Sequence, residues 1–302
     1  MRTHHVLITG GNGLIGKPLT KALLQQGHRV SHLSRQPGRI DGVTTYGWDI
    51  PKGQIDDHCL EGVDTIIHLA GADIASEPWT PERKTELISS RIESIQLLYR
   101  LMRQQAHSVQ SIISASGIVY YGDRGDDLLT EQSAPAIDFL AACTSQWEAA
   151  VDEGKTLNLR VVKFRTGVVL TKEGGALPAL AQPVQSGYGA PIGNGHQWVS
   201  WIHLQDVVGL YLLAVTNSSL EGVFNQTAPE PVTNRQLVDA IARQFNKSLW
   251  MPSTPKFLLK MIMGERSTFV LSSINARPSA LLQQLYTYHY PTINGALEGI
   301  YA

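Results

Sequence analysis

The chain has 302 residues, of which 43% are hydrophobic and 17% are charged, and its formal net charge at pH 7 is -1. A chain of this length and composition can bury a large core, in one large unit or two smaller ones. Acidic and basic residues are mixed along it, which disfavours a nucleic-acid partner or an anionic membrane surface. We therefore expect a small molecule as the partner, and the sequence leaves the oligomeric state open.

The two cysteines, Cys59 and Cys143, lie far apart in unrelated contexts. A disulfide framework or a structural zinc site would need more ligands or closer spacing, so we expect two reduced thiols and no metal. Few residues precede the first expected strand, which leaves no room for a signal peptide, and no apolar run is long enough to span a bilayer. These features predict a cytoplasmic protein without a membrane anchor.

The most informative stretch lies at the start of the chain, where an apolar run enters a glycine-rich turn and an amphipathic segment leaves it. This order predicts strand, tight turn and helix. Gly10 suits the sharp turn, Gly13 has no Cβ to block a pyrophosphate, and Gly16 lets the helix lie against the strand. The N–H groups at the helix start would then face the phosphates of a dinucleotide. The cofactor contacts expected here are Thr9, Gly10, Asn12, Gly13, Leu14, Ile15 and Gly16.

The second expected strand, residues 29–35, indicates which dinucleotide is favoured. A NAD-binding unit carries an acidic residue here, about 20 residues after the glycines, to bind the ribose 2′-hydroxyl. This chain has Ser34 and Arg35 instead. An arginine can pair with a 2′-phosphate, and no carboxylate is present to repel one. The sequence therefore favours NADP(H), with a solvated arginine at a strand end as the alternative.

Strands and helices alternate up to residue 166, with further strands expected at 44–48, 65–72, 111–116 and 159–166 and helices at 80–105 and about 136–153. The fourth strand is apolar without alternation, which is typical of a parallel strand covered on both faces, and it ends in Leu69, Ala70 and Gly71, where a cofactor can approach. On the helix at 80–105, Arg91 is the one basic residue that we consider for an inward position. The pattern predicts an α/β fold, a Rossmann-type doubly wound parallel sheet, in residues 1–166.

From about residue 167 glycine and proline become frequent and the regular alternation is lost. We expect residues 167–302 to form a smaller C-terminal substrate-binding lobe over the carboxyl edge of the sheet, and leave open whether a strand returns from it to the sheet. Within this lobe, helices are expected from Asp206, as an N-cap, and over 234–245, with a strand at 220–226.

Several motifs together resemble the extended branch of the short-chain dehydrogenase/reductase superfamily. They are Thr-Gly-x-x-Gly-x-x-Gly at 9–16, His-Leu-Ala-Gly at 68–71, Arg-Thr-Gly-Val-Val-Leu at 165–170 and Trp-Ile-His-x-x-Asp at 201–206. A closer resemblance, to the YfcH-like epimerase family, rests on Ser-Gly-Ile-Val-Tyr-Tyr-Gly-Asp at 116–123, Trp-Glu at 147–148, Gly-x-Gly-x-Gln-Trp-x-Ser-Trp-Ile-His at 193–203 and Ala-Pro-Glu-Pro-Val-Thr-Asn at 228–234. The resemblance implies an NADP(H)-binding, epimerase-like oxidoreductase that acts on a hydroxyl or carbonyl group of a sugar-like substrate.

The sequence departs from the superfamily at its usual catalytic pair. Members carry Tyr-x-x-x-Lys on the helix after the fifth strand, where the ammonium lowers the pKa of the phenol for proton transfer. Aligned on Glu148, this chain has Leu140 and Thr144 at those positions. The resemblance leaves Ser116 to hydrogen-bond the reacting hydroxyl and Tyr120 or Tyr121 to transfer the proton, while the alternative is that both tyrosines only pack.

Five further residues are expected in the substrate pocket, namely Arg165, Gln197, Trp198, Trp201 and His203. Arginine can anchor an anionic or hydroxylated substrate, and indoles offer a stacking surface and a donor. For the histidine, a satisfied core position is the alternative to catalysis. Two functions remain. One is an NADP(H)-dependent oxidoreductase or epimerase. The other is a weakly active or inactive module that binds NADP(H) as a structural or sensing ligand and regulates a partner.

Overall fold

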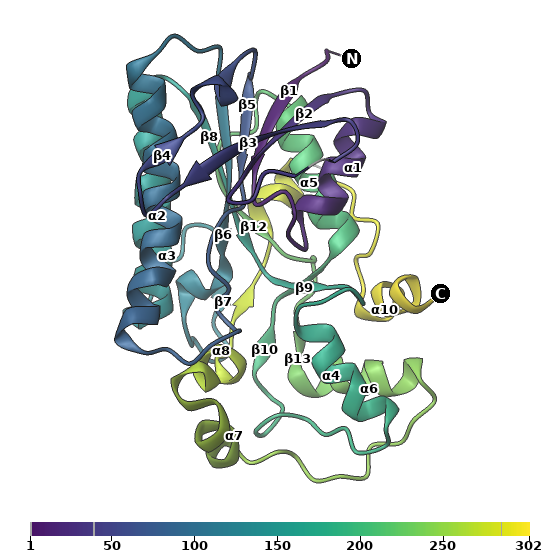
Figure 1. Cartoon of the computed structure of the whole chain (residues 1–302). Coiled ribbons are helices and arrows are strands. Elements are labelled where there is room, and N and C mark those ends of the chain that lie inside the picture. Colours follow the sequence, from purple (N-terminus) through teal and green to yellow (C-terminus); the bar gives the residue numbers. More distant parts are fainter. Residues whose placement is uncertain (1, 39, 285) are drawn as a thin grey trace.

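The computed structural model describes residues 2–38, 40–284 and 286–302. Within these residues an eight-stranded sheet runs in the order β12-β8-β6-β5-β1-β2-β3-β4 (Figure 1). Its strands are β1 (His5–Thr9), β2 (Arg29–Ser34), β3 (Val43–Asp49), β4 (Gln54–Ile55), β5 (Thr65–His68), β6 (Ser111–Gly117), β8 (Arg160–Thr166) and β12 (Gly222–Gln226). Neighbouring strands pair in parallel except β3 and β4. Because Thr9 pairs with Leu33 on one side and His68 on the other, the carboxyl ends of the central strands meet at one edge.

Helices cover both faces of this sheet. α1 (Gly16–Gln25) and α5 (Leu204–Thr216) pack together on one face, and α2 (Pro81–Gln104) and α3 (Phe139–Asp152) pack together on the other (Figure 1). Side chains of β1 point alternately into the two cores, with Val6 and Ile8 in one and Leu7 in the other. Burying each such side chain stabilises the fold by about 1.5–3 kcal/mol, which explains why the central strands are apolar on both faces.

Part of the chain after residue 167 belongs to the sheet. β12 lies beside β8, with Phe224 opposite Phe164, and α5 packs against α1. The segment 204–226 therefore leaves the lobe and completes the doubly wound sheet before the chain returns to the lobe.

The lobe lies beyond the carboxyl edge of the sheet, in the lower part of Figure 1. β9 (Val168–Leu170) pairs with β11 (Trp201–His203), β10 (Trp198–Val199) with β13 (Val232–Thr233), and β7 (Leu128–Leu129) with β14 (Asn275–Ala276). Its helices are α4 (Ala176–Gln185), α6 (Asn234–Gln244), α7 (Lys256–Met263), α8 (Ser267–Leu271) and α10 (Ile293–Tyr301). α9 (Ser279–Gln283) instead packs against β12, with Leu281 in the core of the sheet. Short 3₁₀ helices occupy Asp57–Leu60, Ile118–Tyr121, Glu153–Leu157 and Gly264–Arg266.

The expectation that Asp206 caps a helix is wrong. α5 begins at Leu204, and His203 caps it, because its Nδ1 accepts the N–H of Gln205 at 3.0 Å. Asp206 is fully buried in the first turn and accepts the N–H groups of His289 at 2.8 Å and Tyr290 at 3.0 Å. Its carboxylate therefore ties the C-terminal segment to the helix that covers the sheet.

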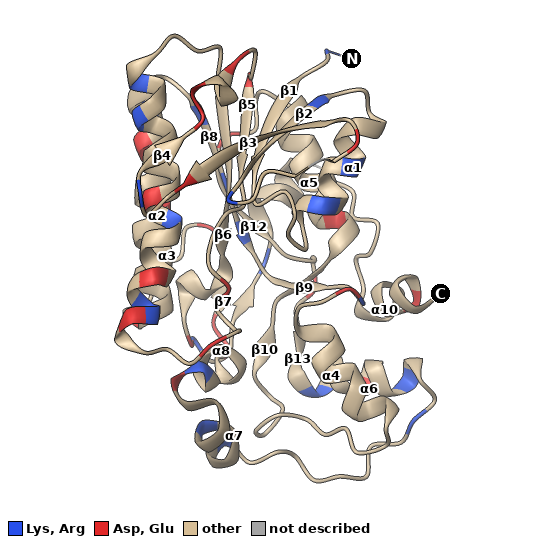
Figure 2. Cartoon of the chain, in the orientation of Figure 1, with Lys and Arg blue, Asp and Glu red and all other residues tan. Residues whose placement is uncertain are grey.

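Charges of both signs are interleaved along the helices, most visibly on α2 (Figure 2). In the part of the chain that the structure describes, no helix is long and apolar enough to cross a membrane.

Candidate functional site

The turn after β1 has the geometry that its glycines predict. Gly10 has φ +73°, and a Cβ there would lie 3.0 Å from the carbonyl carbon of Leu69. A Cβ on Gly16 would clash with the carbonyl oxygen of Gly10. At Gly13 a Cβ would meet only that same oxygen, at 3.2 Å, and the residue is exposed. The first and last glycines are thus required by the turn itself, and the middle one leaves its outer side open for a ligand.

Unpaired donors surround this open side. Ile15 precedes α1 as its N-cap, and no side chain caps the helix. The backbone N–H groups of Leu14 and Ile15 have no acceptor among the described residues, and Asn12 is exposed beside them. Since the start of a helix carries a partial positive charge, these donors form a site suited to a phosphate.

The loop after β5 borders the same turn. Thr9 is buried, and its Oγ1 accepts the N–H groups of Leu69 and Ala70, each at 3.1 Å. Its hydroxyl therefore joins the ends of β1 and β5. Leu69 and Ala70 are half-buried and Gly71 is exposed, so this loop and the glycine turn form one continuous wall.

Arg91 stiffens that wall from behind. It takes the inward position considered for it: the guanidinium is buried and donates to the carbonyl oxygens of Leu87 at 2.8 Å and Ala72 at 2.9 Å. It also lies beside Gly71, where a Cβ would come within 3.2 Å of its Cζ. A buried cation therefore supports the backbone of the loop.

The end of β2 lies next to the turn, because β2 pairs with β1. Ser34 Oγ donates to the carbonyl oxygen of Gln36 at 2.9 Å and accepts its N–H at 3.2 Å. Arg35 is exposed and forms no ion pair or hydrogen bond with the other described residues. Its guanidinium is thus available for an anion at the edge of the turn.

His32, which the sequence reasoning missed, packs beneath the turn. A Cβ on Gly11 would overlap its ring, and its Nε2 lies 2.8 Å from Thr20 Oγ1. Burial lowers the pKa of His32 to about 4, so the ring is neutral at pH 7. It therefore fills space under the turn without adding charge, and its only sequence signal was its place on β2.

Ser116, at the end of β6, belongs to a buried ion cluster. Its Oγ donates to Glu148 Oε1 at 2.6 Å. Arg165 donates to both oxygens of this carboxylate, at 2.8 and 2.9 Å, and Lys163 Nζ lies 3.9 Å from Oε2. Burial alone would lower the pKa of the Arg165 guanidinium, but the hydrogen bonds and charge of Glu148 raise it above its usual range. The serine is therefore held by a carboxylate whose charge Arg165 balances, while Lys163 pairs more closely with Asp152.

The two tyrosines after β6 have different environments. Tyr121 is fully buried, donates to Asn225 Oδ1 at 2.6 Å and accepts from Arg165 Nη1 at 3.0 Å. Burial raises the pKa of Tyr121 to about 12, so it keeps its proton at neutral pH. Tyr120 is half-buried, and the guanidinium carbon of Arg165 lies 3.4 Å from the centre of its ring. Of the two, Tyr120 has the phenol that is free of such a buried hydrogen-bond chain.

No acid or base occupies the usual positions on α3. Leu140 is buried near the N-terminus of this helix, where Asp138 Oδ1 caps it by accepting the N–H of Ala141. Thr144 is buried one turn later, and its Oγ1 donates to the carbonyl oxygen of Leu140 at 2.7 Å. Its hydroxyl therefore serves the helix and not a substrate.

A cavity of about 300 Å³ lies beside Leu140. It is open to solvent on one side and bordered by the loop after β6, the start of α3 and the segment that carries α7 and α8. Its lining includes Val119, Asp138, Leu140, Lys256, Lys260 and Phe269. The volume falls within the range of small-molecule sites. Because Val119, Gly122 and Asp123 of the segment that follows β6 line it, this cavity is the candidate substrate chamber.

None of the five residues expected in the pocket lines this cavity. Arg165 is in the ion cluster, and Gln197 is buried and donates to the carbonyl oxygen of Ile192 at 3.0 Å. Trp198 donates to Asp126 at 2.8 Å. Trp201 is 0% exposed and donates to the carbonyl oxygen of Glu230 at 3.0 Å, so its indole has no surface left for stacking a ligand.

His203, the last of these residues, caps α5 and lies against Tyr290, with 3.9 Å between the ring centres. Burial lowers the pKa of His203, so its ring is neutral at pH 7. It joins the sheet domain to the C-terminal segment.

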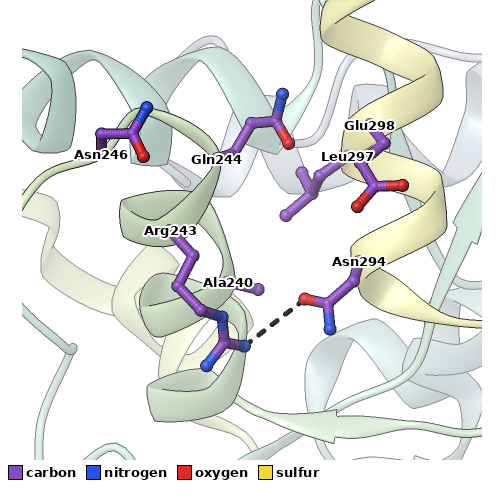
Figure 3. A pocket seen from close by; sticks show the side chains of 7 residues that line it. All are labelled: Ala240, Arg243, Gln244, Asn246, Asn294, Leu297 and Glu298. Atoms are coloured by element: carbon purple, nitrogen blue, oxygen red, sulfur yellow. Dashed lines mark hydrogen bonds between the residues drawn. The ribbon is translucent and has the colours of Figure 1, made fainter.

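A second cavity, of about 310 Å³, lies between α6 and α10 (Figure 3). Arg243 Nη2 donates across it to Asn294 Oδ1 at 3.4 Å. Its lining comes from α6, the residues that follow it and α10, whereas the cavity beside Leu140 borders the loop that follows β6.

In this protein a doubly wound parallel sheet is combined with a glycine turn between its first strand and a helix that no side chain caps. This combination defines a Rossmann-type nucleotide-binding fold of the extended short-chain dehydrogenase/reductase class. Residues 6–225 match the NAD dependent epimerase/dehydratase family, and residues 254–300 match a domain of unknown function, DUF1731. The chain belongs to the NAD-dependent epimerase/dehydratase family. The expected fold class and the family resemblance are thus confirmed.

Similar proteins extend over nearly the whole chain. The epimerase family protein YfhF of Bacillus subtilis is 33% identical over 99% of this chain and 98% of its own length. The human epimerase family protein SDR39U1, solved with NADPH, is 30% identical with a TM-score of 0.86, over 98% of both chains. A nucleoside-diphosphate sugar epimerase from Corynebacterium glutamicum is 31% identical with a TM-score of 0.81, over 99% of this chain and 58% of that chain.

Proposed function

We propose that this protein is an NADP(H)-dependent, epimerase-like oxidoreductase that acts on a hydroxyl or carbonyl group of a small, sugar-like molecule. The observation that carries this proposal is the cavity beside Leu140, which is lined by residues of the segment that follows β6 and by the start of α3. A ligand-sized cavity at this place gives a substrate access to the end of β6, where a cofactor bound along the glycine turn would reach.

The cofactor site supports NADP(H) in particular. The free N–H groups of Leu14 and Ile15 suit the pyrophosphate, and the exposed Arg35 suits a 2′-phosphate. Ser34, Leu69, Ala70 and Gly71 complete the wall along which the ribose and nicotinamide would lie. The similar human structure was solved with NADPH. When bound, the nicotinamide supplies or accepts the hydride.

The remaining groups divide the work on the substrate. Because Ser116 donates its proton to Glu148, its oxygen is left to accept a hydrogen bond from a substrate hydroxyl. Tyr120 is our candidate for the proton-transfer group, because the hydroxyl of Tyr121 is held between Asn225 and Arg165. Glu148 and Arg165 act as positioning residues for the serine and the tyrosine.

One observation favours a second function, an NADP(H)-binding module that senses the cofactor or regulates a partner. Leu140 and Thr144 offer no acid or base on α3, and the hydroxyl of Ser116 is already engaged. A module of this kind would bind NADP(H) through the same turn without turnover.

The test is to incubate NADPH-loaded protein with a panel of carbonyl compounds and follow the cofactor absorbance, with chromatography of the products to detect epimerisation. An oxidoreductase oxidises NADPH with at least one compound and slows strongly on Ser116→Ala, while NADPH affinity stays the same. Tight NADPH binding with unchanged absorbance and unchanged compounds across the panel would support the module instead.

A further inference from the structure

We infer that the cavity beside Leu140 binds a compact, polyhydroxylated substrate that carries an oxyanion, a phosphate or a carboxylate, and that Lys256 and Lys260 of α7 hold this group. The inference rests on the proposed function, because it takes this cavity as the substrate chamber. It adds the class of substrate and the residues that select it.

The two lysines lie one helical turn apart on α7, and both line the cavity. The described lysines that pair with a carboxylate are Lys52, Lys84, Lys155 and Lys163. Lys256 and Lys260 are exposed and, like Lys17, Lys21, Lys172 and Lys247, have no carboxylate within 4.0 Å among the described residues. Two cations on one wall of a cavity, without counter-ions, favour an anionic group in the ligand.

The position of Lys256 is set by a glycine. A Cβ on Gly193 would lie 3.1 Å from Lys256 Cε and 3.2 Å from its Cγ, so the stem of the lysine runs directly over this residue. Gly193 has φ +61°, which also favours glycine, and its N–H donates to the carbonyl oxygen of Thr254 at 2.9 Å. The start of α7 is thus attached to the Gly193 turn.

The rest of the Gly-x-Gly-x-Gln motif holds this turn in place. Gln197 Nε2 donates to the carbonyl oxygen of Ile192 at 3.0 Å, and Asn234 Oδ1 accepts the N–H of Ile192 at 2.7 Å. The motif does not touch the cavity itself. Its role in this structure is to position the lysine that does.

Two carboxylates line the same cavity. Asp138 Oδ1 accepts the N–H of Ala141, and Asp123 Oδ1 accepts the N–H groups of Gly125 and Ser273. Among the described residues, neither second carboxylate oxygen has a hydrogen-bond donor, so both can accept hydroxyl groups of a ligand. Repulsion from these carboxylates would keep an oxyanion at α7 and place the hydroxylated part of the ligand toward Leu140.

The size of the cavity limits the ligand further. About 300 Å³ is at the lower end of the range for small-molecule sites. It suits a sugar acid or a sugar phosphate better than a nucleotide-linked sugar, which is larger by a nucleoside and a diphosphate.

The test is calorimetric titration of the NADPH-saturated protein with glucose phosphate, gluconate and glucose. We expect at least one of the two anions to bind about tenfold or more tightly than glucose. The Lys256→Gln/Lys260→Gln variant should lose this preference, and Lys247→Gln, an exposed lysine outside the cavity, should keep it. Comparing the two anions separates phosphate from carboxylate recognition.

A second variant tests the role of the motif. Gly193→Ala should weaken anion binding severalfold without changing NADPH affinity, whereas Gly27→Ala should not, because Gly27 has φ +79° but nothing within 4 Å of a Cβ. Equal binding of glucose and both anions, or an unchanged preference in the double lysine variant, would overturn the inference. Anion binding without any turnover would instead leave it standing and refute the proposed function.

Discussion

Replacing Arg35 by alanine tests the choice of cofactor. Arg35 is exposed at the end of β2 and has no partner among the described residues, so its removal should cost the fold little. If its guanidinium pairs with the 2′-phosphate, a charge-assisted pair of this kind contributes roughly 1.5–3 kcal/mol. This energy corresponds to a loss of about ten- to hundredfold in NADPH affinity.

The assay is fluorescence titration of the wild type and Arg35→Ala with NADPH and with NADH. We expect the NADPH affinity of the variant to fall to that of NADH, and the NADH affinity to stay the same. The preference of the wild type for NADPH should also shrink with added salt, because an exposed ion pair is screened. Arg29→Ala is the matched control, an exposed arginine at the opposite end of the same strand.

Two results would refute this reasoning. If NADH binds the wild type more tightly than NADPH, the assignment of the cofactor is wrong. If Arg35→Ala binds NADPH as tightly as Arg29→Ala does, Arg35 is only a solvated arginine at the end of a strand.

Three other predictions concern the ion cluster, the tyrosines and pH. Glu148→Gln leaves the buried guanidinium of Arg165 without its counter-ion and should lower the free energy of unfolding by about 3–5 kcal/mol, measured by denaturant titration; a loss below 1 kcal/mol would contradict the cluster's role. Tyr121→Phe should destabilise the fold by about 1–3 kcal/mol and largely keep turnover. Tyr120→Phe should abolish turnover and keep the stability of the fold. The reverse pattern would exchange the roles of the two tyrosines. Burial lowers the pKa of His32 to about 4 and that of His68 to about 3, whereas the pKa of both is about 6.5 in the unfolded chain. Between these values the unfolded state binds more protons than the folded state. The free energy of unfolding should therefore fall as the pH drops below 6.5. Replacing the two histidines by glutamine should flatten this dependence, and an unchanged acid limb would exclude them as its cause.

The parts that the sequence predicts best are local ones. The strand, glycine turn and helix at the start of the chain involve neighbouring residues, and the structure has β1 at His5–Thr9 and α1 at Gly16–Gln25. The helix expected at 80–105 is observed as α2 over Pro81–Gln104. In each case a local pattern, either of glycines or of apolar spacing, determines the element.

The parts that sequence reasoning missed depend on residues that are far apart in the chain. Ser116 meets Glu148 32 residues later, and no spacing rule connects a strand end to that helix position. Trp201 had the chemistry of a pocket residue, but its indole is buried in the core of the lobe, and composition alone does not reveal which way a side chain points. Asp206 had the chemistry of a cap, but segment 289–290 supplies its partners.

The lysines of α7 were missed for a related reason. No element of its own is predicted for residues 256–263. Their place over the cavity depends on the contact of Lys256 with Gly193 and on the packing of the C-terminal segment against the loop after β6. Neither contact leaves a periodic signal in the sequence.

The most direct test of the proposed chemistry is a label transfer. The protein is incubated with NADPH that is deuterated at the transferable nicotinamide position and with a panel of compact carbonyl compounds, with and without an oxyanion, and the products are analysed by mass spectrometry. We expect deuterium to appear on the former carbonyl carbon of a compound that carries an oxyanion, and the label to be lost with Ser116→Ala. Bound NADPH that transfers no deuterium to any compound in the panel would contradict a catalytic role and leave a cofactor-binding module.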